Sequence, residues 1–258
     1  MEKLTAVGAA IGALEQIARS RELDDKGIFA WPLHRTRYRS SGSFPQKQLL
    51  GILKYPNVVA IPSARLLAAG RLLLGNPGQR ERALLLAVLT AGGVGMNARH
   101  HYGNDGSDQM AQVTFTVSLL AKAFPNDSRA REACLRFVAF QACVSYASAG
   151  TVKLVSPMWR NGSAVTGIFR TQSYGDATIY ELLKRYPALS VALAWTVILG
   201  ELAFPLVLVA PRPVARGMLA MGTVFHLANG KFMGLNRFIW AFSGTYPAVA
   251  HVSRALPS

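Results

Sequence analysis

Three ionisable side chains lie within apolar stretches of this sequence, and their types are those that carry acid–base chemistry. Lys153 comes near the end of "SYASAGTVKLV", Glu201 lies in "WTVILGELAFPLVLV", and His226 lies in "VFHLANGKF". An ionisable group in an apolar environment is costly, so each is a candidate for a functional site. A buried lysine can serve as a general base, and a carboxylate or an imidazole can exchange protons with it. We therefore predict these three as catalytic residues.

Each of the three also has a structural interpretation. Lys153 can extend its ammonium group to a membrane surface from the end of a helix. Glu201 can pair with a basic residue of a neighbouring helix, and His226 can hydrogen-bond across a helix contact. The spacing alone leaves both interpretations open.

Two of these residues have polar companions at helical spacing. Tyr146 precedes Lys153 by seven residues and so lies on nearly the same helix face, and Asn229 follows His226 by three. We predict Tyr146 and Asn229 as substrate-binding residues, together with Trp159, which follows Lys153 closely in the chain.

The segment "NDGSDQM" adds two carboxylates, Asp105 and Asp108. They are further candidates for substrate binding, but both also suit the N-cap and the first turn of a helix. Two Asp residues and one Ser do not define a metal site. The two cysteines, Cys134 and Cys143, show no metal-ligand spacing, so we predict no metal.

The composition indicates a membrane protein. Of the 258 residues 51% are hydrophobic and only 16% are charged, whereas a soluble domain carries about 25% charged residues. We predict an all-α fold: a polytopic integral membrane bundle of about six to eight helices in the cell membrane, multi-pass. The expected spans are 57–75, 82–97, 109–124, 133–153, 188–210 and 214–233, with a shorter apolar stretch at 4–18 and a last one at 235–252.

The chain divides by composition into two parts. Residues 1–56 hold the short apolar stretch, as a first span or an interfacial helix, and a basic segment with eight Lys and Arg between Arg19 and Lys54. We place this basic segment on the cytoplasmic side. Residues 57–258 form the expected transmembrane bundle. Within it, residues 154–187 are too polar for a span and form a long connection, of a kind that is usually functional or ordered.

The net charge of +15 raises the question of nucleic-acid binding. The basic residues lie between apolar segments, where they would meet anionic lipid head groups. No nucleic-acid-binding motif accompanies them. The partner that we expect is therefore the lipid bilayer and not a nucleic acid.

The segment "YASAGTVKLVSPMWRNGSA" resembles the signature of the HTTM superfamily, the membrane domain shared with vitamin K-dependent gamma-carboxylase. That signature reads Y-x-x-A-G-x-x-K-L, followed by Trp and then Gly. "FHLANGKFMG" and "NDGSDQM" are similar to two further parts of the family pattern, in the right order. The matching residues of the signature are Tyr146, Ala149, Gly150, Lys153, Leu154, Trp159 and Gly162.

The resemblance implies a role for Lys153, because the matching lysine of the carboxylase is the base that deprotonates reduced vitamin K. By the same resemblance a reduced quinone such as vitamin K is the expected cofactor, and Trp159 and Gly162 form an interfacial anchor and a turn. This sequence departs from the family at Gly106, where the carboxylase has a functional histidine. The spacing from Leu154 to Trp159 is also one residue longer.

Three functions follow from this reading. The first is a short bacterial-type HTTM protein with an intramembrane site for a quinone or lipid-like molecule, whose enzyme class would be a carboxylase- or epoxidase-like lyase or an oxidoreductase. The second is an accessory factor of the sporulation-delaying toxin type, which matures or exports a secreted peptide together with a partner membrane protein. The third is a structural subunit of a membrane complex.

Overall fold

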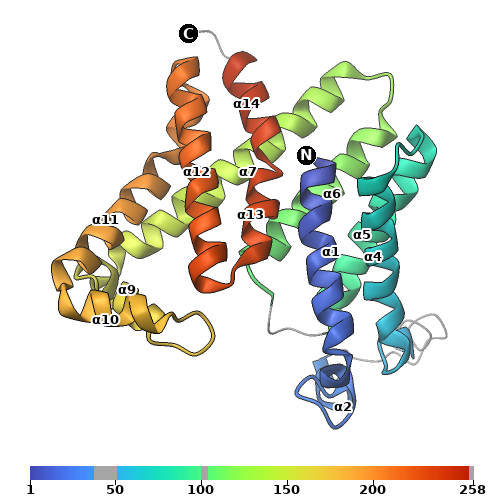
Figure 1. Cartoon of the computed structure of the whole chain (residues 1–258). Coiled ribbons are helices and arrows are strands. Elements are labelled where there is room, and N and C mark those ends of the chain that lie inside the picture. The colour runs from blue at the N-terminus through green and yellow to red at the C-terminus, as the bar shows by residue number, and fades with distance from the viewer. Residues whose placement is uncertain (38–50, 100–103, 256–258) are drawn as a thin grey trace. The chain divides into compact units, whose positions relative to one another are not determined.

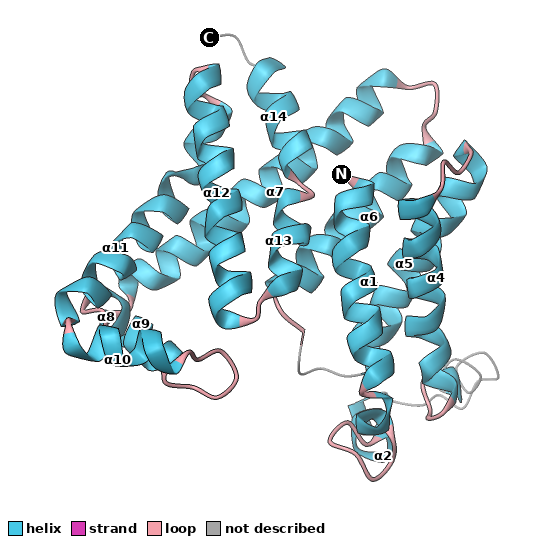
Figure 2. Cartoon of the chain, viewed as in Figure 1, coloured by secondary structure: helices cyan, strands magenta, loops and turns pink. Residues whose placement is uncertain are grey.

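The computed structural model describes residues 1–37, 51–99 and 104–255, and these are helical, without a β-strand in the described ranges. The all-α prediction is confirmed at this level (Figure 2). Part of the basic segment predicted between Arg19 and Lys54, residues 38–50, lies outside the described residues. The chain forms two compact units, Glu2–Asn126 and Asp127–Ser258, the second of which also includes Met1.

The first unit is built from four long helices that lie side by side (Figure 1). Its core is rich in alanine, which lets α1 and α4 approach closely. The residues of this core are Ala6, Ala9, Ala68, Ala69, Leu72, Leu86, Leu89 and Phe115. The long helices are α1 (Glu2–Ala18), α4 (Ala60–Leu74), α5 (Gln79–Arg99) and α6 (Gly106–Ala123), with the short elements η1 (Ser20–Leu23), α2 (Trp31–His34), η2 (Arg35–Arg37) and η3 (Asn57–Val59).

A buried arginine at the end of α5 binds the segment that follows α1. The Arg99 side chain is fully buried; its Nη2 donates to the Leu23 carbonyl oxygen at 2.7 Å, and its guanidinium lies 5.2 Å from the ring centroid of Trp31. Because α1 packs on α4, the first compact unit contains residues from both sides of the boundary that we predict at residue 56. The division into 1–56 and 57–258, which concerns membrane topology rather than packing, stays a prediction.

The second unit is organised around α7 (Ser128–Val155), which packs against α11 (Pro187–Ala203) and α14 (Tyr246–Ala255). The polar connection 154–187 folds into three short helices that pack beside α11. The remaining elements are α8 (Pro157–Arg160), α9 (Ser163–Phe169), α10 (Ala177–Arg185), η4 (Phe204–Leu208), α12 (Arg212–Met233) and α13 (Asn236–Ser243).

Within the described residues, three helices are long and apolar enough to cross a membrane: Asn57–Leu74, Ser128–Val155 and Pro187–Leu208. They correspond to three of the expected spans. The other expected spans are helical too, but α5, α6 and α12 are not apolar enough along their length to be counted with these three; α12, for example, carries Arg212, Arg216 and Lys231. The full count of about six to eight membrane helices stays a prediction.

The last apolar stretch, 235–252, forms two helices, α13 and α14. The chain breaks between α13 and α14 at Gly244 and Thr245, and Pro247 stands in the first turn of α14. Proline cannot continue a preceding helix because it lacks the N–H donor and its ring clashes with the previous turn.

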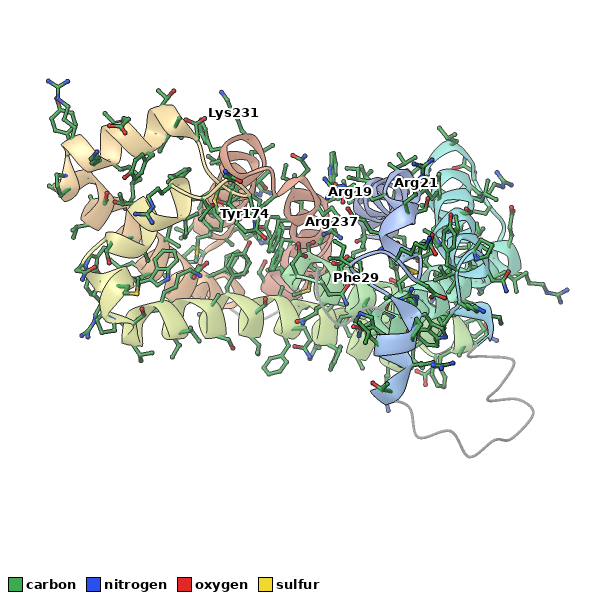
Figure 3. The ribbon with its side chains drawn as sticks, turned by 90° about the horizontal axis from the view of Figure 1, so that it is seen from below. Arg19, Arg21, Phe29, Tyr174, Lys231 and Arg237 are labelled. Atoms are coloured by element: carbon green, nitrogen blue, oxygen red, sulfur yellow. The ribbon has the colours of Figure 1, made fainter. Side chains whose placement is uncertain are left out.

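Two basic side chains flank the turn between α12 and α13: Lys231 in the last turn of α12 and Arg237 in the first turn of α13. Both are labelled in Figure 3 with Tyr174, which lies in the loop before α10. Lys, Arg and Tyr at helix ends are typical of membrane–water interfaces.

Candidate functional site

Lys153 and Glu201 form an ion pair between α7 and α11. The Lys153 Nζ donates to both carboxylate oxygens of Glu201, at 2.7 and 2.9 Å. The side chains are 19% and 9% exposed, respectively. The lysine bends back toward the preceding turn, where its Nζ lies 3.5 Å from the Ala149 carbonyl oxygen. Its charge is therefore directed at a specific partner and not extended past the end of the helix.

Gly150 allows the two helices to bring this pair together. A Cβ at position 150 would lie 3.0 Å from the Leu202 backbone nitrogen and 3.1 Å from the Glu201 Cβ. Only a residue without a side chain permits this approach of α7 to α11. Gly150 thus has a physical role, because it places Glu201 within reach of Lys153, one turn further along α7.

The chain after α7 folds back over the lysine. The Lys153 Nζ lies 5.2 Å from the ring centroid of Trp159 in α8, a distance typical of a cation–π contact. Gly162 then turns the chain with φ of +79°, and it packs against the backbone of Ser190 and Val191 in α11. The expected turn at Gly162 is confirmed, and the turn holds Trp159 beside Lys153.

A second polar cluster joins α7, α12 and α14. The Tyr146 hydroxyl lies 2.6 Å from the His226 Nε2 and 2.7 Å from the Tyr246 hydroxyl. All three side chains are buried. Tyr146 precedes Lys153 by two helical turns. The same face of α7 therefore provides Lys153 for the ion pair and Tyr146 for the tyrosine–histidine cluster.

Aromatic rings enclose this second cluster. Phe204 stacks on Tyr146 with 3.8 Å between ring centroids, and Phe242 stacks on His226 at 4.7 Å. Pro205 sets the position of Phe204: it has no N–H to donate to the Glu201 carbonyl, so α11 ends at Ala203 and continues as the 3₁₀-helix η4. The polar groups of the cluster are thus shielded from solvent.

Gly222 of α12 leaves room for the two tyrosine hydroxyls. A Cβ there would clash with the Tyr246 hydroxyl and lie 3.5 Å from that of Tyr146. We expect Gly222→Ala to lower the free energy of unfolding by about 1–3 kcal/mol, because the added methyl group would displace the Tyr246 hydroxyl from its hydrogen bond with Tyr146. Gly217→Ala in the same helix meets nothing within 4 Å and is the matched control. Unfolding of both variants in mixed micelles measures the difference; equal stabilities would contradict the packing argument.

One apolar cavity connects the two clusters. It has a volume of about 140 Å³ and is lined by residues of α7, α11, η4 and α12. A cavity of this size holds a single ring, since about 150 Å³ suffices for benzene. Glu201 and Tyr146 both line it, so the ion pair and the tyrosine–histidine cluster share one space. The other lining residues are Val197, Gly200, Phe204, Met218, Met221, Gly222 and Phe225.

The predicted site residues divide into two groups. Lys153, Glu201, Tyr146, His226 and Trp159 come together in the second unit, with the contacts given above. Their roles in binding or catalysis stay predictions.

Asn229 is half-buried in α12, and it is not among the residues that line the cavity. Its backbone carbonyl accepts from the Leu235 N–H at 3.2 Å, in the turn after the helix.

The remaining pair, Asp105 and Asp108, belongs to the first unit. The Asp105 carboxylate accepts from the backbone N–H groups of Ser107 and Asp108, while Asp108 accepts from the Asp105 N–H at 3.3 Å. This is a capping box at the start of α6. The local structural interpretation of these two residues is therefore the one that their hydrogen bonds support.

Sequence reasoning missed Tyr246, the second hydrogen-bond partner of Tyr146. Its signal was available, since a tyrosine hydroxyl inside the apolar stretch 235–252 needs a partner when it is buried. It also missed Phe204 and Phe242, for which no sequence signal distinguishes a ring over a polar cluster from an ordinary core ring.

No group of three or more His, Cys, Asp and Glu side chains that could hold a metal ion is found in the described ranges. Cys134 is half-buried and Cys143 is buried, and both are free.

Comparisons of this chain with protein-family models, with curated proteins and with solved structures find no match.

Proposed function

We propose that this chain is a multi-pass protein of the cell membrane, whose second unit binds a quinone or similar lipid-like molecule with Lys153 as the base. Support for the membrane part comes from the three long apolar helices, in which only 28–33% of the residues are buried within the protein. Large apolar side chains point outward from them and from α12, including Phe140, Leu199 and Met221 at 59%, 58% and 69% exposure. Surfaces of this kind favour contact with lipid chains.

The observation that carries the ligand site is the shared cavity. Glu201 and Tyr146 line it together, each hydrogen-bonded to a second ionisable residue, Lys153 and His226 respectively. The rest of the lining is apolar. Binding sites for small molecules combine these features: a mostly apolar pocket and a few convergent polar groups. The single-ring volume fits the head of a small quinone, with any chain leaving between the helices toward lipid.

The ion pair offers a way to make a neutral lysine. When a proton moves along the 2.7 Å hydrogen bond, an N–H bond of Lys153 breaks and an O–H bond of Glu201 forms. The resulting amine and carboxylic acid carry no charge, which suits an apolar environment. Glu201 lines the cavity, so a hydroxyl of a bound ligand can pass its proton to the Glu201 carboxyl group while the carboxyl's own O–H proton moves back to the Lys153 amine. The Tyr146–His226 pair supplies a second place for proton exchange.

The test is retention of a specific ligand. We expect protein that is purified in native nanodiscs from carbonate-washed membranes to contain a quinone or lipid enriched over the bulk membrane, as detected by mass spectrometry. Val197→Trp should remove that enrichment, because it fills the cavity between α11 and α12. Leu193→Trp is the matched control, one turn earlier on the same helix and outside the cavity.

Three outcomes would contradict the proposal. Loss of the protein from the membranes during the carbonate wash would remove the membrane part. Equal lipid profiles for wild type and Val197→Trp would remove the ligand site. A stoichiometric co-purifying protein without any enriched small molecule would favour the accessory or structural alternatives.

A further inference from the structure

The Tyr146 hydroxyl has two hydrogen-bond partners but only one proton. Its oxygen lies within hydrogen-bond distance of the His226 Nε2 and of the Tyr246 hydroxyl. A phenol oxygen can accept hydrogen bonds while its O–H donates. The direction of each bond therefore decides where the Tyr146 proton points.

The surroundings of His226 select its tautomer. The Nδ1 atom is buried and has no hydrogen-bond partner in the described part of the chain. The rings of Phe225, Phe238 and Phe242 pack around the imidazole, at 5.1, 6.3 and 4.7 Å between centroids. A proton on Nδ1 would be a buried donor without an acceptor, and such orphaned donors are rare in proteins. The proton thus belongs on Nε2, which donates to the Tyr146 oxygen.

With His226 as a donor, the Tyr146 proton is available to other acceptors. The Tyr246 hydroxyl can donate to the same oxygen, because it has its own proton and Tyr146 has a lone pair remaining. The Tyr146 hydroxyl lies beside Gly222, and both residues line the cavity. Two donors on one oxygen also polarise its O–H and make it a stronger donor.

We propose that Tyr146 donates a hydrogen bond into the cavity, that His226 and Tyr246 are positioning residues for this proton, and that the ligand presents an oxygen acceptor on a ring-sized apolar group. The assignment rests on the proposed function only in taking the cavity as a ligand site. The assignment also predicts which part of the ligand contacts Tyr146: a carbonyl, ether or hydroxyl oxygen that accepts the hydrogen bond. The carboxylate of Glu201, which is held by Lys153, lines the same cavity and provides a second polar contact.

Two fluorinated probes of nearly equal size test the donor. Fluorobenzene has no oxygen, and 4-fluorophenol carries one; ¹⁹F NMR measures the binding of each to the full chain in nanodiscs. We expect wild type to prefer 4-fluorophenol over fluorobenzene, and Tyr146→Phe to reduce that preference by about tenfold while still binding fluorobenzene. Each probe partitions into the bilayer to the same extent whichever variant is present. The difference in binding between wild type and variant in the same lipid is therefore free of this contribution. Tyr186→Phe, the same change at an exposed tyrosine, is the control.

A third probe and a nitrogen spectrum test the direction of the bonds. 4-Fluoroanisole accepts but cannot donate, so its binding should also weaken in Tyr146→Phe. The two-bond ¹H–¹⁵N spectrum of histidine-labelled protein should show the His226 imidazole protonated on Nε2, with the signal assigned by its loss in His226→Gln. A purely structural role of His226 would place no requirement on the tautomer.

The outcomes separate the two proposals. Binding of fluorobenzene with an unchanged 4-fluorophenol preference in Tyr146→Phe would overturn the donor while the cavity site stands. Protonation of His226 on Nδ1 would overturn the positioning role, because Tyr146 would then have to donate to the imidazole. Absence of binding by every probe to wild type would overturn the donor and the cavity site together.

Discussion

Replacing Lys153 with methionine is expected to lower the free energy of unfolding by about 3–5 kcal/mol, the cost of leaving a buried charge without its partner. The Lys153 Nζ holds both Glu201 oxygens, and the carboxylate is largely buried. Methionine keeps an unbranched apolar side chain but removes the ammonium group. Unfolding by sodium dodecyl sulfate in mixed micelles provides the measurement.

The double variant Lys153→Met with Glu201→Met should recover most of this loss, since apolar residues that replace both members of a buried pair leave no stranded charge. Arg136→Met is the control on the same helix. Its pair with Glu132 is exposed, so its removal should cost about 0–1 kcal/mol. If Lys153→Met is as stable as the control variant, or if the double variant is no more stable than the single one, the pair does not support the fold.

Lys153→Arg separates the pairing role from the proposed base. Arginine keeps the positive charge and can bind the carboxylate with two parallel hydrogen bonds, so the variant should fold and retain most of the stability. Arginine cannot supply a neutral amine, because its pKa exceeds about 12. The function should therefore be lost in a folded protein. A fully active Lys153→Arg variant would rule out the base and leave Lys153 as the partner of Glu201.

Gly162→Ala is expected to have the next largest effect, about 2–5 kcal/mol, from two causes that can be measured separately. The left-handed conformation, with φ of +79°, costs a residue with a side chain about 1–2 kcal/mol. A Cβ at this position would also lie 2.7 Å from the Val191 backbone nitrogen and 2.8 Å from the Ser190 carbonyl carbon. Backbone atoms cannot rotate away as a side chain can, so overpacking adds about 1–3 kcal/mol.

Gly234→Ala isolates the first cause. Gly234 has nearly the same conformation, with φ of +70°, and a Cβ there meets nothing within 4 Å. This variant should lose only the conformational cost. The comparison uses the same unfolding assay, together with proteolysis of the loop before α10 as a local readout of the displaced turn. Equal losses for the two glycines would show that the contact with α11 contributes nothing.

The sequence by itself determined the features of this protein that arise over one or two turns of chain. The apolar composition and spacing predict helices, and the described residues form helices. The carboxylates of "NDGSDQM" suit a helix start, and Asp105 caps α6. Gly162 suits a turn after Trp159, and it adopts the left-handed conformation that a turn requires. These outcomes depend on neighbours within about four residues, because helix caps and turns close their hydrogen bonds locally.

Only the tertiary structure decided which polar groups pair. The cost of burying a charge predicts that Lys153, Glu201 and His226 need partners, but it does not say which ones. Lys153 and Glu201 are 48 residues apart in the chain, Tyr146 and His226 are 80 apart, and Tyr146 and Tyr246 are 100 apart. These pairings follow from how closely α7 approaches α11, α12 and α14. That approach depends on the absence of a side chain at Gly150 and Gly222 and on the end of α11 before Pro205. Each of these is a steric condition met only when distant helices pack, so no local pattern in the sequence contains it.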